Sequence, residues 1–228
     1  MPPSPRNRRR VAVQGRIIET VADLSDGVAA LKRACPVMRR VIEVAGDPPL
    51  RRSTASFEGL ARIVVGQQLS IASAAAIWSR TLLAVQPFEP AVLLGLDAAT
   101  LAKAGLSGAK IRTLRALSEA LVAARFDPAK FADVPDETIH QHLVAVSGIG
   151  PWTADIFILF CLGRADGWAS GDLALQIAAQ HAFGLEARPT AKELQTLAER
   201  WRPWRGVAAS LLWAYYGAIK GGRNAQPV

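Results

Sequence analysis

Apolar residues recur every three or four positions along nearly the whole chain, and this spacing leaves few folds open. It is the period of a helix that buries one face, because 3.6 residues complete a helical turn. Residues 11–18 show some of the alternation of a strand, but that stretch is short and isolated. We therefore predict an all-α protein of about ten helices.

Capping residues, prolines and glycines divide this pattern into separate helices. Ser70 and Asp172 are suitable N-cap residues, and residues 190–193 form a capping box. The helices that we expect cover residues 26–45 with a break at Pro36, 57–67, 70–83, 90–94, 98–104, 107–124, 151–162, 172–183 and 190–201, with two more that begin near residues 127 and 135 and a last one that follows Pro203 and ends near residue 219.

The chain is basic: its 228 residues include 27 Lys and Arg against 19 Asp and Glu, a formal net charge of +8. Such a balance favours a polyanionic partner, usually nucleic acid, with a generically basic protein as the alternative on charge alone. Arginines are concentrated at the start of the chain, at Arg6, Arg8, Arg9 and Arg10. We expect residues 1–20 to form a flexible basic arm.

The length of the apolar stretches and the number of cysteines indicate the cellular compartment. The longest strongly apolar stretch, residues 156–162, is far shorter than the ~20 residues of a membrane-spanning helix. Cys35 and Cys161 are isolated, so they suggest neither a disulfide framework nor a metal site. We expect no membrane association and a reducing compartment, which is the bacterial cytoplasm or, in a eukaryote, the nucleus.

The sharpest local motif is the turn of residues 147–150, Ser-Gly-Ile-Gly, between two predicted helices. Gly148 and Gly150 permit positive φ and remove the Cβ that would block a close neighbour. A helix that starts at Pro151 directs free N–H groups outward, and such groups bind phosphate. A plain helix–helix turn is the alternative for a lone Gly-x-Gly, but the flanking apolar residues and the following Trp-Thr-Ala of residues 152–154 favour a phosphate site.

This segment resembles the helix-hairpin-helix of the DNA glycosylase superfamily that includes endonuclease III and 3-methyladenine DNA glycosylase II. That family carries an essential aspartate at a helix start after the hairpin, and here Asp172 lies twenty positions after Trp152. Residues 57–70, with Gly-Gln-Gln at 66–68, are also similar to the family, and residues 200–205 and 212–216 are similar to its alkyl-base branch. The resemblance covers roughly residues 25–220.

The resemblance implies two helical subdomains with a DNA-binding cleft between them. We expect one subdomain to be a bundle of residues 57–163 that contains the hairpin. The other would join residues 21–56 to residues 164–222. The implied partner is double-stranded DNA that contains a damaged base, bound by a monomer.

The branch of the family follows from two differences in chemistry. Bifunctional members carry a nucleophilic lysine just after the hairpin, where this chain has Trp152, so we expect no strand cleavage. Iron–sulfur members carry four closely spaced cysteines near the C-terminus, and no cysteine follows Cys161 here. The resemblance thus implies a monofunctional glycosylase that removes alkylated bases of the 3-methyladenine type and requires no cofactor.

The same resemblance suggests roles for individual residues. Asp172 would be the catalytic carboxylate, because an ionised carboxylate can stabilise positive charge on the deoxyribose and orient the attacking water. Its alternative role is that of a plain N-cap, and one carboxylate can cap a helix and take part in catalysis at the same time. A damaged base must leave the duplex to be cut, and aromatic faces can stack on it. The expected base pocket comprises Trp152, Trp213 and Tyr216.

Three further groups complete the predicted site. Gln68 or Leu69 would be the wedge that fills the space left by the flipped base. Gly148, Gly150 and Thr153 would bind DNA phosphate. The backbone carbonyls of Val144, Val146 and Ile149 would hold a monovalent cation, as the family's hairpin commonly does. Two other functions stay open, namely a glycosylase for deaminated or oxidised bases and a non-catalytic helix-hairpin-helix protein that binds DNA.

Overall fold

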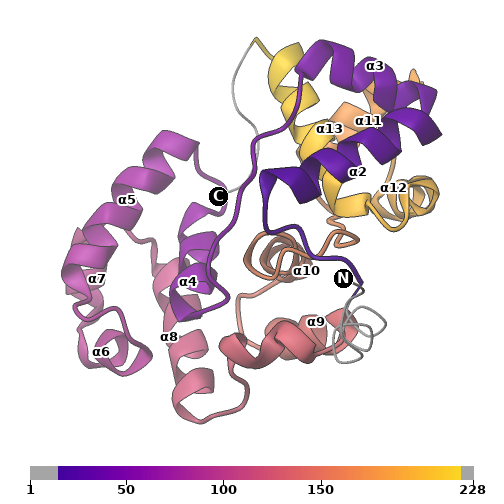
Figure 1. Ribbon diagram of the computed structural model, residues 1–228. Helices are drawn as coiled ribbons and strands as arrows, with labels where there is room; N and C mark the ends of the chain where they lie inside the picture. Colours follow the sequence, from indigo (N-terminus) through magenta and orange to yellow (C-terminus); the bar gives the residue numbers. More distant parts are fainter. Residues whose placement is uncertain (1–14, 222–228) are drawn as a thin grey trace. The chain divides into compact units, whose positions relative to one another are not determined.

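The computed structural model describes residues 15–221, and its regular secondary structure in that range is helical (Figure 1). One isolated antiparallel bridge, between Ile17 and Arg164, is the exception. The predicted all-α class is therefore confirmed. The described part of the chain divides into two compact units, which we call the terminal unit (residues 15–52 and 158–221) and the central unit (residues 53–157).

The terminal unit is built around the long last helix of the chain. Its helices are α2 (Val21–Ala34), α3 (Pro36–Ala45), α11 (Leu173–Phe183), α12 (Ala191–Ala198), the 3-10 helix η3 (Glu199–Trp201) and α13 (Arg205–Ile219). α13 packs against α2, α3 and α11 (Figure 1). Trp201 and Trp213 are the largest fully buried side chains, and the ring of Trp201 lies 5.5 Å from that of Trp168. Trp201 is thus a core residue, as its large apolar ring favours.

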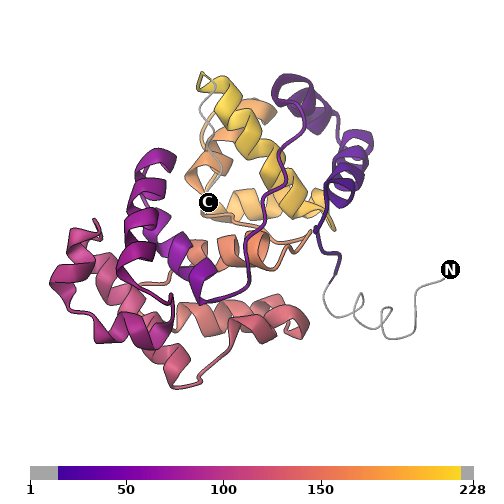
Figure 2. The ribbon, with the colours of Figure 1, turned by 60° about the vertical axis from the view of Figure 1, so that its left-hand side comes forward.

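The central unit is a contiguous bundle. Its elements are α4 (Phe57–Gly66), α5 (Ile71–Ala84), α6 (Pro90–Gly95), α7 (Ala98–Lys103), α8 (Gly108–Val122), the 3-10 helix η1 (Pro128–Asp133), α9 (Asp136–Val144) and α10 (Pro151–Ile156). α8 packs against α4, α6 and α7, and α9 packs against α10; Figure 2 gives a second view. After α10 the chain continues as the π-helix η2 (Phe157–Cys161), in which the boundary between the units lies.

Three expected boundaries are wrong for physical reasons. Residues 15–20 are not a flexible arm, because Ile18 is buried and its N–H donates to the Gly163 carbonyl at 2.8 Å. The first helix starts at Val21 and not at residue 26, since Thr20 and Asp23 form a capping box. Residues 158–163 lie in the terminal unit, where Arg52 Nη1 donates to the Phe160 carbonyl at 3.3 Å. Residues 1–14 lie outside the described range.

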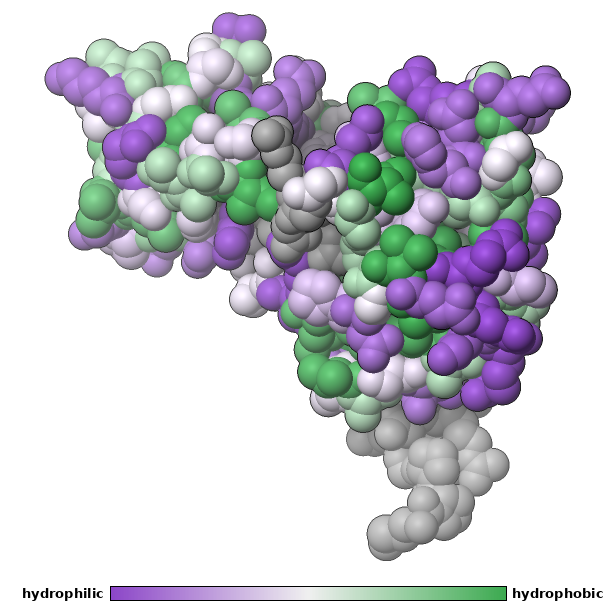
Figure 3. Space-filling view, turned by 90° about the horizontal axis from the view of Figure 1, so that it is seen from above, coloured by the Kyte–Doolittle hydropathy of each residue, from purple (hydrophilic) through white to green (hydrophobic). Residues whose placement is uncertain are grey.

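Hydrophilic and hydrophobic residues are interspersed over the surface seen in Figure 3. Scattered apolar side chains are usual on a protein surface. Two of the exposed ones, Leu69 and Ile71, lie close together at the turn from α4 to α5. Within residues 15–221, no helix combines the length and the apolar character needed to cross a membrane.

Candidate active site

The hairpin turn needs a glycine at its first position. Gly148 has a φ of +85°, in the left-handed region that other residues rarely adopt. A Cβ on Gly148 would also lie only 1.9 Å from Oγ1 of Thr113 on α8. Both reasons that the sequence suggested, positive φ and close approach, therefore apply to Gly148.

Gly150 differs from Gly148, because it has neither positive φ nor a close neighbour within the protein. Its φ of −92° and ψ of 173° are ordinary extended values, and a Cβ would meet nothing within 4 Å. Within the described range, neither the Gly148 N–H nor the Gly150 N–H donates a hydrogen bond. The turn thus offers two backbone donors and open space beside Gly150, which suits an anion.

Thr153 does not fit its predicted role as a phosphate ligand. Its side chain is 1% exposed, and its Oγ1 accepts a hydrogen bond of 2.8 Å from Nε2 of Gln67. Its backbone N–H donates to the Gly150 carbonyl at 3.0 Å. Because both groups are engaged inside the central unit, Thr153 supports the turn from within.

The predicted cation ligands are the carbonyls of Val144, Val146 and Ile149. The Val146 carbonyl accepts a hydrogen bond of 3.0 Å from the Ile149 N–H, which leaves one of its two lone pairs. Such oxygen ligands suit a hard cation. No cluster of three or more His, Cys, Asp or Glu side chains in residues 15–221 could hold a metal ion.

Asp172 is held by two donors of the terminal unit. It is the N-cap of α11, and its Oδ1 accepts from the Leu175 N–H at 2.9 Å and from Nε1 of Trp213 at 3.0 Å. The residue is only 7% exposed. The helix N-terminus favours a negative charge at this position because its free N–H groups carry partial positive charge. The predicted capping role is thus observed, and the carboxylate has a fixed orientation.

Trp213 does not fit its predicted role in stacking on a base. Its side chain is 0% exposed, its ring lies 5.5 Å from that of Phe160, and its N–H is directed at Asp172. A ring buried in this way presents no free face, so Trp213 orients the carboxylate instead. Tyr216, on the same helix α13, is half-buried, as is Trp152 in the first turn of α10.

The predicted wedge residues lie at the turn between α4 and α5. Gln68 is exposed and has a φ of +55°, which is uncommon outside glycine. Leu69 is 38% exposed, and Ser70 then caps α5 by accepting from the Ser73 N–H. We call residues 67–70 the wedge turn after the role predicted for them. The central unit therefore contains this turn, the hairpin and Trp152, and the terminal unit contains Asp172, Trp213 and Tyr216.

Sequence reasoning missed a carboxylate beside the hairpin. Asp155 of α10 lies with its Oδ1 3.6 Å from Nε2 of His140 on α9. Burial disfavours the charged form and raises the pKa of Asp155 to about 7. The signal in the sequence was an acidic residue inside the predicted helix 151–162, most of whose other positions are apolar.

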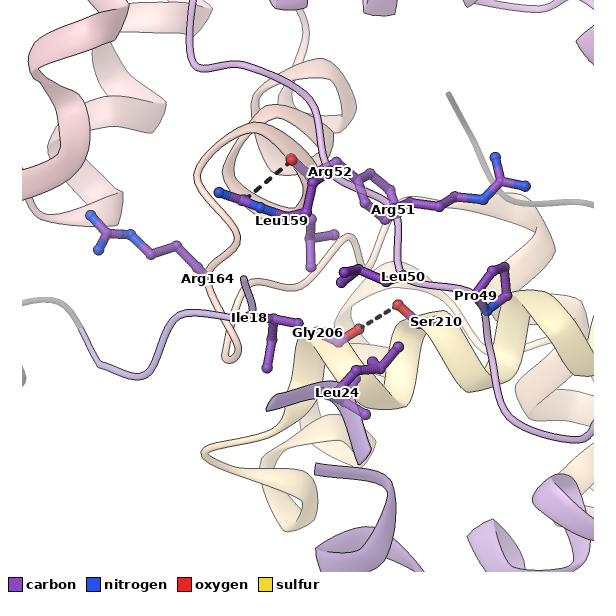
Figure 4. Close-up of a pocket in the computed structure, with 12 residues that line it drawn as sticks. Ile18, Leu24, Pro49, Leu50, Arg51, Arg52, Leu159, Arg164, Gly206 and Ser210 are labelled. Atoms are coloured by element: carbon purple, nitrogen blue, oxygen red, sulfur yellow. Dashed lines mark hydrogen bonds between the residues drawn. The ribbon is translucent and has the colours of Figure 1, made fainter. Parts of the chain in front are cut away.

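A small cavity of about 30 Å³ lies in the terminal unit (Figure 4). Apolar residues such as Leu24, Leu50 and Leu159 line it, and Arg52 extends from the same stretch of chain as Leu50 to the Phe160 carbonyl. A volume of this size holds one or two water molecules. It is too small for a nucleobase, so this cavity is not the base pocket.

A comparison with known families gives a match over residues 61–203, more than half of the chain, to the HhH-GPD superfamily of base excision DNA repair proteins. The chain belongs to this superfamily. The match includes the wedge turn, the hairpin and Asp172, which supports the resemblance found in the sequence.

The chain matches different shares of the lengths of individual HhH-GPD relatives. DNA-3-methyladenine glycosylase 1 of Schizosaccharomyces pombe is 26% identical over 182 residues, which are 77% of this chain and 80% of that protein. A probable bifunctional transcriptional activator/DNA repair enzyme AlkA of Mycobacterium tuberculosis is 31% identical over 213 residues, 87% of this chain but 41% of that protein.

Among solved structures, the S. pombe 3-methyladenine DNA glycosylase Mag1 in complex with abasic DNA has a TM-score of 0.76. The alignment covers 88% of this chain and all of that one, with 22% sequence identity. At this identity the likeness concerns the fold, and it agrees with the all-α architecture of both units.

Proposed function

We propose that this HhH-GPD protein is a monofunctional DNA glycosylase that hydrolyses the N-glycosidic bond of alkylated bases in base excision repair. The observation that carries the proposal is the buried carboxylate of Asp172, whose Oδ1 is fixed by a helix N-terminus and an indole N–H. Relatives named DNA-3-methyladenine glycosylase 1 and alkylbase DNA glycosidase-like protein mag2, both of S. pombe, support the choice of alkylated bases.

Asp172 would act on the sugar and on water. As the bond from C1′ to the base nitrogen breaks, the base leaves with the electron pair and C1′ becomes positive. A carboxylate beside it stabilises that charge. A water oxygen then bonds to C1′, and the water gives up one proton to the carboxylate. A cationic alkylated purine leaves readily, so this route needs no second acid.

The hairpin would hold the backbone of duplex DNA. The N–H groups of Gly148 and Gly150 are unused within residues 15–221, and the open space at Gly150 lets a phosphate approach. The carbonyls of Val144, Val146 and Ile149 would bind a monovalent cation that adds positive charge there. Gln68 or Leu69 would enter the space left by the extruded base, and Trp152 and Tyr216 would contact the base itself.

The strand would stay intact, because position 152 is Trp and offers no amine to attack the sugar. We further propose that the protein acts as a monomer on damaged double-stranded DNA within the cell, in the bacterial cytoplasm or the eukaryotic nucleus.

The test is incubation with methylated duplex DNA, followed by identification of the released bases and of strand breaks before alkali treatment. We expect free 3-methylated and 7-methylated purines and abasic sites without nicks. Asp172→Asn should abolish release but keep DNA affinity, because an asparagine oxygen still caps α11 and accepts from Trp213. Full activity of this variant would overturn the mechanism.

The same assay separates the alternatives. Release of deaminated or oxidised bases in place of alkylated ones would change the substrate class. DNA binding without release from any damaged duplex would show a non-catalytic binding protein. Nicks that the protein itself produces would contradict the monofunctional assignment.

A further inference from the structure

The turn between α4 and α5 exposes apolar side chains beside a constrained backbone. Leu69 and Ile71 are 38% and 50% exposed, and Gln68 between α4 and Leu69 has a φ of +55°. A non-glycine residue keeps such a conformation only where the surrounding structure holds it. The contacts that hold this turn are therefore of functional interest.

Two hydrogen bonds with distant parts of the sequence hold the end of α4. Lys110 of α8 donates from Nζ to the Val65 carbonyl at 2.7 Å, and Gln67 donates from Nε2 to Thr153 Oγ1 of α10 at 2.8 Å. The last carbonyls of a helix have no partner within the helix, so Lys110 satisfies one of them. Gln67, the C-cap of α4, connects the turn to the hairpin helix.

The hairpin is held by the same two helices. Thr113, one turn after Lys110 on α8, fills the space opposite Gly148. Thr153 follows the hairpin in the first turn of α10. Within the central unit, the wedge turn and the hairpin are thus braced by α8 and joined directly through the side chains of Gln67 and Thr153.

The hydrogen bond between Gln67 and Thr153 differs from those that other helical threonines of both units make. Thr81, Thr113 and Thr196 each donate to the carbonyl four residues earlier in their own helix. The hydroxyl of Thr153 instead accepts from a side chain 86 residues away, while it is 1% exposed. A part-buried side-chain hydrogen bond between distant segments helps to fix their relative position.

We propose that Gln67 and Thr153 form a positioning pair that sets the wedge turn at a fixed distance from the hairpin. With the hairpin on a backbone phosphate, the wedge would then reach the base stack at one defined step of the duplex. The pair touches neither sugar nor base, so it acts through Gln68 and Leu69. This inference rests on the proposed function, because it assigns the wedge and the hairpin to DNA.

The test uses Thr153→Val and Gln67→Leu, which remove the hydrogen bond and nearly keep the side-chain volume. Base extrusion is followed by the fluorescence of 2-aminopurine placed beside a lesion, and base release by single-turnover kinetics. We expect both steps to slow about tenfold, with duplex affinity within about twofold of the wild type. Since the two side chains share one bond, the double variant should be no slower than either single variant.

Two matched variants separate positioning from simple folding. Thr153→Ser keeps the hydroxyl and should restore extrusion, whereas Thr81→Val removes an equally buried hydroxyl that bonds only within α5 and should leave extrusion unchanged. Wild-type extrusion in Thr153→Val, additive losses in the double variant, or equal losses in Thr81→Val would overturn the proposal. If the wild type releases no base, the proposed function fails, while the extrusion signal, which needs no chemistry, still tests the pair.

Discussion

Two hydrogen bonds to one oxygen, Oδ1, orient the carboxylate of Asp172. The Leu175 N–H belongs to the helix that Asp172 caps, whereas the Trp213 N–H comes from α13. The first bond links the carboxylate only to its own helix. The second fixes the plane of the carboxylate, which matters for a group that must face a developing positive charge.

Trp213→Phe should therefore slow base release and leave DNA affinity nearly unchanged. Phenylalanine keeps an aromatic ring against Phe160 but has no N–H to donate to Asp172. Loss of one hydrogen bond to a charged group corresponds to a decrease of about tenfold or more in the single-turnover rate constant. Single-turnover kinetics and fluorescence anisotropy with a labelled duplex measure the two quantities.

Trp168→Phe is the matched control for this variant. Trp168 is also buried in the terminal unit, but its Nε1 has no hydrogen-bond partner among the described residues. Both variants remove the same volume from the core, so both should lower the thermal midpoint. Equal rate constants for the two variants would show that the indole N–H of Trp213 does not matter for catalysis.

The roles of single residues were predictable where they depend only on neighbours in the sequence. The place of Asp172 before a helix follows from its neighbours, because an N-cap bonds to a residue three positions later. The roles of Trp213 and Thr153 were misjudged because they depend on packing. Nothing in the neighbouring residues indicates that Trp213 is 0% exposed or that Thr153 meets Gln67.

The two glycines of the hairpin should behave differently when a methyl group is added. Gly148→Ala places a Cβ against Thr113 and forces positive φ on alanine, which should cost about 1–3 kcal/mol of unfolding free energy or more. Gly150→Ala has open space and ordinary φ, so its stability should stay within about 0.5 kcal/mol. Chemical denaturation of both variants measures this difference.

Gly150→Ala nevertheless tests the phosphate site, because the methyl group would occupy space that we assign to DNA. Its affinity for undamaged duplex should fall while its fold is unchanged. Wild-type affinity in Gly150→Ala would argue against close approach of a phosphate at this residue.

The burial of Asp155 on α10 should make stability depend on pH. An unfolded aspartate titrates near 3.8, and burial raises the pKa of Asp155 to about 7. Between these values the folded state keeps a proton that the unfolded state has lost, so stability falls as pH rises from about 4 to about 7 and is level above. Asp155→Asn should remove this contribution and flatten the thermal midpoint plotted against pH.

The contribution of His140 must be separated from this effect, because its Nε2 lies 3.6 Å from Oδ1 of Asp155 and carries a charge only when protonated. In a His140→Gln background, Asp155→Asn should still flatten the curve to the same extent, because burial is the cause of the raised pKa. An unchanged slope in Asp155→Asn would mean that other groups govern the pH dependence.

Elements were predictable where caps and apolar spacing specify them. The helices α4, α5, α8, α11 and α13 lie within a few residues of the expected ranges. Helices were expected where η1 and η2 lie, but their 3-10 and π types were not, because side-chain spacing does not show to which carbonyl each N–H donates. The start of α2 was missed because the capping box of Thr20 uses Asp23 in place of Glu or Gln.

At the scale of the whole molecule, the family resemblance implied a contiguous middle segment between two ends that belong to one subdomain. The observed units meet at Arg52–Ser53 and Phe157–Ile158, a few residues before both expected boundaries. The difference arises from contacts such as that of Arg52 with the Phe160 carbonyl, which join segments far apart in sequence. The DNA cleft between the units stays a prediction.

The net charge of +8 leads to the last prediction, which concerns binding by the whole molecule. If phosphate contacts supply most of the affinity, the logarithm of the binding constant should fall linearly with the logarithm of the salt concentration. Each contact contributes about 0.9 to the slope. Phosphate contacts read no base, so a duplex with a lesion and an undamaged duplex should give the same slope and differ by a constant factor.

Fluorescence anisotropy at a series of salt concentrations measures both slopes. The constant factor should reflect the base pocket and the wedge, since extrusion of a damaged base costs less than that of a paired one. Asp172→Asn should keep the slope, whereas Gly150→Ala should lower it by about 1 if it loses one phosphate contact. Affinity that does not change with salt would exclude DNA phosphate as the main ligand of this basic chain.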